Sequence, residues 1–202
     1  VSGGALAPDK SYWSLLEMEH GPKGWSFKKQ SKEPGDLFLL NKDNPYKITR
    51  IETSTAKEAL GIQVRPDFKM KDELQHLRKK ATEWADAIRT KKPPRSTVWY
   101  SLKHCILKTI EYPLATTTFS RKQIDHIMSP IFKAALPLAG VQKNMPRKLI
   151  YGTLKTQGLD IHDPLVTQTI EHLQVILRHS NRKSPTEDMI IENMELVQTH
   201  VG

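Results

Sequence analysis

Six apolar side chains near the middle of the chain follow one another at steps of four, three, four, three and four residues. They are Met70, Leu74, Leu77, Ala81, Trp84 and Ile88. An α-helix turns once in about 3.6 residues, so this spacing places all six on one stripe of a single helix. A strand cannot bury them together, because its side chains alternate between two faces. The pattern therefore predicts a long amphipathic helix that begins after Asp67.

The chain before this helix has a different character. Short aromatic and β-branched runs are separated by Gly, Pro and Asn, which is typical of strands joined by hairpins. The runs cover residues 12–18, 24–27, 36–40, 46–51 and 56–64. We expect them to form a small antiparallel sheet, followed by a mostly helical region. The fold class that this order predicts is α+β.

Short helices with short connectors are expected after the long helix. Pro93-Pro94 breaks the chain, and Ser96 can cap a second helix that stops at Tyr112-Pro113. Ser120 and Gln123 have the spacing of a capping box, which predicts the start of a third helix.

Two more helices are expected near the end of the sequence. Asp163-Pro164 offers an N-cap followed by a proline at the first helical position. Ser184 and Glu187 have the spacing of a second capping box. We therefore predict three regions: strands over 1–66, helices over 67–140, and a last region over 141–202 with two C-terminal helices.

The composition restricts the class of partner. The chain has 31 Lys and Arg against 22 Asp and Glu, a net charge of +9, which indicates a polyanionic partner such as nucleic acid. A soluble protein that is merely basic is the alternative. The single cysteine, Cys105, excludes a disulfide framework and multi-cysteine zinc sites, and it fits a reducing compartment. Since no apolar run approaches the length of a membrane span, we expect an intracellular protein of the nucleus or cytoplasm without membrane contact.

Basic residues gather on the long helix and just beyond its end. They are Arg78, Lys79, Lys80, Arg89, Lys91, Lys92 and Arg95. Such a surface can follow a nucleic-acid backbone through its phosphates, and we predict that these residues bind nucleic acid. The alternative is an ordinary solvated helix face.

Common catalytic patterns are missing from the sequence. The eight histidines include no His-Glu-x-x-His spacing, and neither a Gly-x-Ser-x-Gly elbow nor a glycine-rich phosphate loop is present. Cys105 lies between His104 and Ile106 on an apolar helix, so we expect a buried packing thiol rather than a nucleophile. Trp84 and Trp99 lie at helical core spacing and are expected to pack. We predict no metal site in the chain.

A series of short motifs resembles one family when the motifs are taken in order. The N-terminal stretch from Gly3-Gly4 to Pro8-Asp9-Lys10 resembles the lysine turn of reverse transcriptases from eukaryotic retrotransposons, especially those without long terminal repeats. The motifs that follow it are Leu60-Gly61-Ile62, Leu77–Ala81, Trp99–His104, Lys108–Leu114, Ile127–Ile131, Met145–Gly152 and Gln157–Ile161. Together they span most of residues 1–180. The resemblance implies the end of a polymerase palm over 1–66, a helical thumb over 67–140 and a connection region over 141–202.

The resemblance also implies an activity and its partners. The family is an RNA-directed DNA polymerase that joins nucleotides with two metal ions held by carboxylates, so Mg²⁺ is expected for the complete polymerase. This sequence has no Asp-Asp doublet. We therefore expect the catalytic aspartates to precede Val1 with the fingers and the rest of the palm, and this chain alone to be inactive. The expected partners are an RNA template and an RNA–DNA hybrid or DNA.

Lys10 is the one catalytic residue that the resemblance carries over. In the family, the lysine of this turn approaches the triphosphate and protonates the leaving pyrophosphate, which is a general-acid role. An ordinary turn lysine is the alternative. Ala7 departs from the family, because many relatives have Asn at that position, and this departure puts the hydrogen bonding of the turn in doubt.

A second hypothesis belongs to a different class. The chain could be a self-contained basic helical module that binds nucleic acid or a protein partner and is unrelated to a polymerase. That hypothesis predicts a closed hydrophobic core. A polymerase fragment instead predicts exposed apolar surface and an open sheet edge, where the remaining palm would pack.

Overall fold

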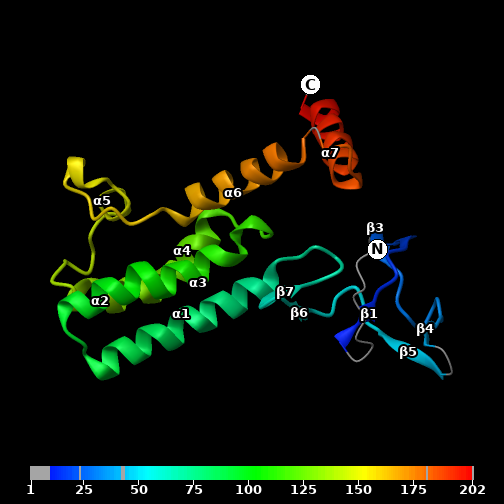
Figure 1. Ribbon diagram of the computed structural model, residues 1–202, viewed down its shortest axis with the longest axis horizontal. Helices are drawn as coiled ribbons and strands as arrows, with labels where there is room; N and C mark the ends of the chain where they lie inside the picture. Colours follow the sequence, from blue (N-terminus) through cyan, green and yellow to red (C-terminus); the bar gives the residue numbers. More distant parts are fainter. Residues whose placement is uncertain (1–9, 23, 42–43, 181, 202) are drawn as a thin grey trace. The chain divides into compact units, whose positions relative to one another are not determined.

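The computed structural model describes residues 10–22, 24–41, 44–180 and 182–201. The chain divides into two units, residues 1–73 and residues 74–202. The described strands all belong to the first unit, and helices make up the second (Figure 1). The chain is therefore α+β, as its sequence predicts.

The strand unit contains three small sheets in its described residues. Their strands are β1 (Tyr12–Trp13), β2 (Met18–Gly21), β3 (Gly24–Phe27), β4 (Leu37–Asn41), β5 (Asn44–Arg50), β6 (Lys57–Ala59) and β7 (Ile62–Val64). The first sheet has the order β1-β5-β4, and the other two are the hairpins β2-β3 and β6-β7. The prediction of a single antiparallel sheet is wrong, because the strands divide among three sheets and β1 pairs with β5 in parallel.

Two of the predicted strands are also wrong in their extent. The run over 12–18 is not one strand: Tyr12–Trp13 form β1, residues 14–17 are irregular, and Met18 is the first residue of β2. The pairing of β1 with β5 ends near the hydrogen bond from the Ile51 amide to the Trp13 carbonyl, at 2.9 Å. The run over 56–64 is a hairpin rather than one strand. Leu60 and Gly61 form its turn, with φ of 52° and 81°. A two-residue hairpin turn of this kind requires positive φ, which glycine adopts at little cost.

A partly buried ion-pair cluster stabilises the segment between β7 and the helix α1 (Lys71–Lys91). Arg65 donates two hydrogen bonds to the Asp67 carboxylate, at 2.9 and 2.7 Å, and a third to Asp72, at 2.9 Å. The Asp67 side chain is 4% exposed. Glu73, in the first turn of α1, accepts a hydrogen bond from the Gln63 amide of β7, at 2.6 Å. These contacts fix the end of β7 to the beginning of α1.

The second predicted helix is one continuous helical run with an irregular middle. It consists of α2 (Arg95–Ser101), a π-helical segment (Leu102–Ile106) and α3 (Leu107–Glu111), and a 3₁₀ turn (Tyr112–Ala115) follows it. Its N-cap is Pro94 rather than the predicted Ser96. A π-helical turn contains one extra residue, so it shifts the buried face of the residues that follow it.

The core of the helical unit is built around α4 (Arg121–Leu138). Its predicted capping box is confirmed: the Gln123 amide donates to the Ser120 hydroxyl, at 3.4 Å, and the Ser120 amide donates to the Gln123 side chain, at 2.8 Å. Nine of its 18 residues are buried. Arg78 of α1 donates to the His126 carbonyl of α4, which links the two helices.

The helix α6 (Pro164–His179) is attached to the loop before α4 by polar contacts. Its predicted N-cap is confirmed, because the Asp163 carboxylate accepts from the Leu165 amide, at 3.0 Å. The buried Gln168 side chain accepts from the Phe119 amide, at 2.9 Å, and donates to the Phe119 carbonyl, at 3.2 Å. The contacts of Gln168 with the Phe119 backbone therefore hold α6 in place.

The segment between α4 and α6 folds back on itself. It contains the short helix α5 (Arg147–Ile150) and a 3₁₀ turn (Leu154–Thr156). Residues 157–161, for which the family resemblance implies a small-residue turn and strand, are irregular, and the Leu159 amide donates to the Leu149 carbonyl, at 2.9 Å. Gly152 and Gly158 touch through their backbones, and a Cβ atom at Gly158 would lie 2.0 Å from the Gly152 carbonyl oxygen.

The last helix, α7 (Pro185–Val201), begins directly after the predicted capping residue, Ser184. The Glu187 amide donates to the Ser184 hydroxyl, at 3.3 Å. The Glu187 carboxylate also accepts from the Lys183 amide, at 2.6 Å, one residue before the position that the capping-box pattern predicts. Both contacts satisfy backbone donors at the start of the helix.

The close backbone contact between Gly152 and Gly158 predicts that a methyl group added at Gly158 destabilises the fold strongly. Gly158→Ala should lower the free energy of unfolding by about 3 kcal/mol or more, since backbone atoms must move to admit the new Cβ. Gly35→Ala is the control, because a Cβ atom at Gly35 would meet its nearest atoms at ordinary distances of 3.8 and 3.9 Å. Urea denaturation of both variants tests this prediction, and equal stability of the two would contradict it.

The ion-pair cluster predicts a pH dependence for the strand unit. Burial alone would raise the pKa of Asp67, but the hydrogen bonds from Arg65 and from the Lys69 amide outweigh it and hold the pKa below its usual value. A lowered native pKa stabilises the fold above the unfolded pKa of about 3.9, and this stabilisation is lost as the pH falls through the native value.

Asp67→Asn should therefore lower the free energy of unfolding at pH 7 by about 2 kcal/mol and weaken its decline in acid. Asp36→Asn removes an exposed partner of Lys47 and should change stability little. Urea denaturation at pH 7 and pH 3 measures both effects. An unchanged acid dependence in Asp67→Asn would show that another group is responsible.

Candidate nucleic-acid interface

The apolar stripe of α1 faces the core of the helical unit, as its spacing predicts, except that Met70 precedes the helix, which begins at Lys71. Leu77, Ala81 and Ile88 are buried, and so is Ala85, which the sequence analysis did not include. The Trp84 indole donates to the Ser101 hydroxyl of α2, at 2.9 Å, so this tryptophan is a packing residue as expected. Because this face is occupied, the remaining faces of α1 are the ones available to a partner.

The basic residues of α1 lie on three different sides of the helix. Arg78 and Arg89 are eleven residues apart, which is about three turns, so they share one flank of the buried stripe. Lys80 and Lys91 have the same separation and share the opposite flank. Lys79 lies between the two flanks, on the face directed away from the core. The structure therefore does not place these side chains in a single row.

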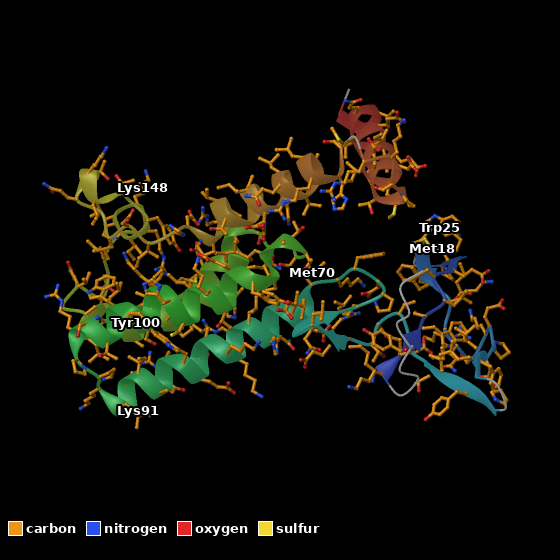
Figure 2. The ribbon with its side chains drawn as sticks, viewed as in Figure 1. Met18, Trp25, Met70, Lys91, Tyr100 and Lys148 are labelled. Carbon is orange, nitrogen blue, oxygen red and sulfur yellow. The ribbon has the colours of Figure 1, made fainter. Side chains whose placement is uncertain are left out.

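Some of these cations already have partners. Arg78 donates to the His126 carbonyl, and Arg89 pairs with Asp86 at 2.9 Å. Lys79 lies 3.9 Å from Glu83, and both side chains are largely exposed, which makes this pair weak. In the described part of the chain, Lys80 and Lys91 form no ion pair. Lys80 is partly exposed, and Lys91 is exposed at the end of α1 (Figure 2).

The turn after α1 holds the last two predicted residues. Lys92 is exposed and ends the helix with a φ of 43°, in the left-handed region where helices commonly stop. Arg95 is exposed and begins α2, but a Cβ atom at Gly140 would meet its guanidinium at 3.3 Å. Arg95 therefore packs against the backbone just after α4. Lys91 and Lys92 are the cations of this turn that make no such contact in the described residues.

The structure places the candidate catalytic lysine at the surface of the strand unit. Lys10 is exposed and lies two residues before β1. The rest of the predicted lysine turn, residues 1–9, lies outside the described residues. Across the described ranges, no group of three or more His, Cys, Asp or Glu side chains could hold a metal ion.

The π-helical segment exposes residues that sequence periodicity did not identify. Cys105 is exposed, so the prediction of a buried thiol is wrong. The extra residue of the π turn explains the error, since it moves the buried positions to Ile106 and Leu107. The ring centres of Tyr100, in α2, and His104, in the π-helical segment, are 4.8 Å apart. These two residues line a cavity of about 370 Å³ together with Trp99, Lys103, Leu154, Gly158 and Leu159.

The comparisons with known proteins add no relative. We compared the chain with protein-family models, with curated proteins and with solved structures, and none of the three found a match. In the described residues, no helix combines the length and the apolar character needed to cross a membrane. The candidate interface therefore rests on the charges and geometry of the chain itself.

The different partners of two neighbouring cations predict different effects on stability. Arg78→Met removes the hydrogen bond to the His126 carbonyl and should lower the free energy of unfolding by about 1 kcal/mol. Lys79→Met removes a similar charge from the outer face and should change it by less than about 0.5 kcal/mol. Urea denaturation of the two variants measures the difference, and the reverse order would contradict the assigned roles.

Proposed function

We propose that the chain is part of a retroelement reverse transcriptase, and that its helical unit holds the template–primer duplex through α1 and the turn that follows it. The observation that carries the proposal is the charge of this segment. Residues 78–95 contain seven basic and two acidic residues, and Lys79, Lys91 and Lys92 are exposed. The order of the sequence motifs supplies the polymerase part of the proposal.

The charge distribution favours contacts with the phosphate backbone over recognition of a specific base sequence. An RNA–DNA hybrid is close to A-form, with a wide minor groove that proteins follow by shape and by phosphate contacts. Lysine side chains on a helix face can approach phosphates without reading bases. We therefore expect binding that tolerates any sequence and weakens steeply with salt.

The apolar surface of the strand unit also supports the proposal. Trp25 is 71% exposed and Met18 is 55% exposed, both on the β2-β3 hairpin (Figure 2). Phe38 and Tyr46 are about half exposed on β4 and β5. Patches of this kind are typical of surfaces that another part of a protein covers. In the proposal, that part is the remaining palm and fingers.

The proposal assigns the chemical step to groups outside this chain, with one exception. The Mg²⁺ ions would be held by carboxylates of the remaining palm. Lys10 would act as the general acid toward the leaving pyrophosphate. This chain alone would bind nucleic acid without extending a primer.

The self-contained helical module is the second candidate, and one observation favours it. The helical unit buries a continuous apolar core of its own, including Leu102, Ile127 and Phe132. The coding sequence before Val1 distinguishes the two candidates. A Tyr-x-Asp-Asp motif within a few tens of codons supports the polymerase, whereas a stop codon without such a motif supports the module.

The proposed contact surface predicts a change in salt dependence. A variant with Lys79, Lys80, Lys91 and Lys92 changed to Ala should bind an RNA–DNA hybrid more weakly, because it releases fewer counterions from the phosphates. The slope of log affinity against log salt should become less steep by up to about 4. Fluorescence anisotropy with a labelled hybrid at several salt concentrations measures the slope.

A matched control removes the same charge elsewhere in the helical unit. Lys122, Lys133, Lys143 and Lys155 are exposed and lie outside α1, so changing all four to Ala should leave most of the slope intact. Equal slopes for the two variants would show that only net charge matters. An unchanged slope in the α1 variant would remove the proposed surface.

A further inference from the structure

A small polar pocket lies in the helical unit, away from α1. It is formed by α4, by α5 with the residue after it, and by the N-cap of α6. Its volume is about 220 Å³, and its lining residues are Arg121, Asp125, Arg147, Lys148, Tyr151 and Asp163. Pockets for drug-sized molecules are commonly about 300–1,000 Å³, so this one suits a single small group.

One pair of charges in the pocket is already satisfied. Arg121 donates to both oxygens of the Asp163 carboxylate, each at 2.8 Å. The same carboxylate caps α6 through the Leu165 amide. This pair forms a fixed wall of the pocket and does not need a ligand.

The other side of the pocket holds polar groups without hydrogen-bond partners. The Tyr151 hydroxyl and the Asp125 Oδ1 atom are both buried, and neither has a hydrogen-bond partner in the described residues. The Arg147 Nε atom lies 3.8 Å from that Asp125 oxygen, so the two side chains form an ion pair but no hydrogen bond. Buried polar groups normally form hydrogen bonds, so two such atoms without one in the same pocket indicate that a ligand supplies the missing hydrogen bonds.

Arg147, the second arginine of the pocket, is held in position by an aromatic ring. The Arg147 guanidinium lies over the Phe132 ring, 4.6 Å from its centre, and the Tyr151 ring meets the same phenylalanine edge to face, at 6.0 Å. A guanidinium stacked on a ring keeps its N–H groups available at its edge. Lys148 is exposed on α5 beside it (Figure 2).

These groups define the chemistry of the missing partner. Arg147 and Lys148 are donors with positive charge, and burial raises the pKa of Tyr151 to about 12, so its hydroxyl remains a donor at neutral pH. Asp125 needs a donor in return. A ligand that fits must carry negative charge, several acceptor oxygens and one proton to donate. Hydrogen phosphate has all three features, and so does a phosphate monoester that retains its second proton, whose pKa is about 6.

We propose that this pocket binds a phosphate monoester group. Tyr151, Arg147 and Lys148 donate to its oxygens, and Asp125 accepts the proton that the phosphate retains. The site lies outside the proposed template–primer surface, and it stands or fails independently of the polymerase proposal.

The test compares phosphate binding by the whole chain and by two variants. Inorganic phosphate is titrated at neutral pH, and binding is followed by ³¹P NMR and by thermal stabilisation of the protein. Tyr151→Phe and Arg147→Met should each weaken binding at least tenfold. Tyr151→Phe removes only a buried hydroxyl without a partner, so its melting temperature without phosphate should equal or exceed that of the original chain.

Matched control variants and a second anion test whether phosphate binding is specific to this pocket. Tyr100→Phe and Lys155→Met make similar changes outside the pocket and should leave binding unchanged. Sulfate has the shape of phosphate but carries no proton at neutral pH, so it should bind more weakly. The absence of saturable phosphate binding, or equal affinity in Tyr151→Phe and the original chain, would overturn the proposal.

The source of the phosphate group is distinguished by a parallel titration. An oligonucleotide with a 5′-phosphate is compared with the same oligonucleotide ending in a hydroxyl, and a nucleoside 5′-monophosphate is added separately. Tighter binding of the phosphorylated oligonucleotide, abolished in Tyr151→Phe, supports the end of a nucleic acid as the ligand. Binding of the monophosphate with no preference between the oligonucleotides supports a small molecule.

Discussion

The helical unit depends on the burial of α4 on several sides at once. A helix that is apolar over most of its surface is stable in water only when neighbours cover it. Here α2 and α6 contact it directly, α1 reaches it through Arg78, and the segment after α4 returns to it through Arg147 and Tyr151. The placement of the other helices follows from this requirement. The basic side chains of α1 lie on its flanks and outer side because one face of the helix is used for the core.

The features predicted correctly from the sequence are those that depend on near neighbours along the chain. The stripe of α1 and the caps at Ser120 and Asp163 arise from side chains a few residues apart, so spacing alone identifies them. The parallel pairing of β1 with β5 joins residues far apart in the sequence, and no local pattern encodes it. The β6-β7 hairpin had a local signal in Leu60-Gly61, because a glycine in such a run can mark a turn, but the prediction of a single strand over 56–64 passed over it.

In the candidate sites too, local features could be predicted from the sequence, and features that depend on the fold could not. The basic residues of α1 could be identified from composition, but their distribution over three sides of the helix required helical geometry and the position of the core. The exposure of Cys105 depends on a π-helical turn, which hydrophobic periodicity does not detect. The phosphate pocket could not be predicted, because Asp125 and Tyr151 belong to separate segments and only the fold brings them together.

The two hydrogen bonds between the Gln168 side chain and the Phe119 backbone have a consequence for how this fold can evolve. Every amino acid except proline presents the same amide and carbonyl at position 119, so the hydrogen bonds constrain the side chain at 168 without constraining its partner. These two hydrogen bonds therefore give the two positions no reason to change together in related chains. Methods that detect contacts from correlated substitutions would overlook this one, although it fixes α6 to the core.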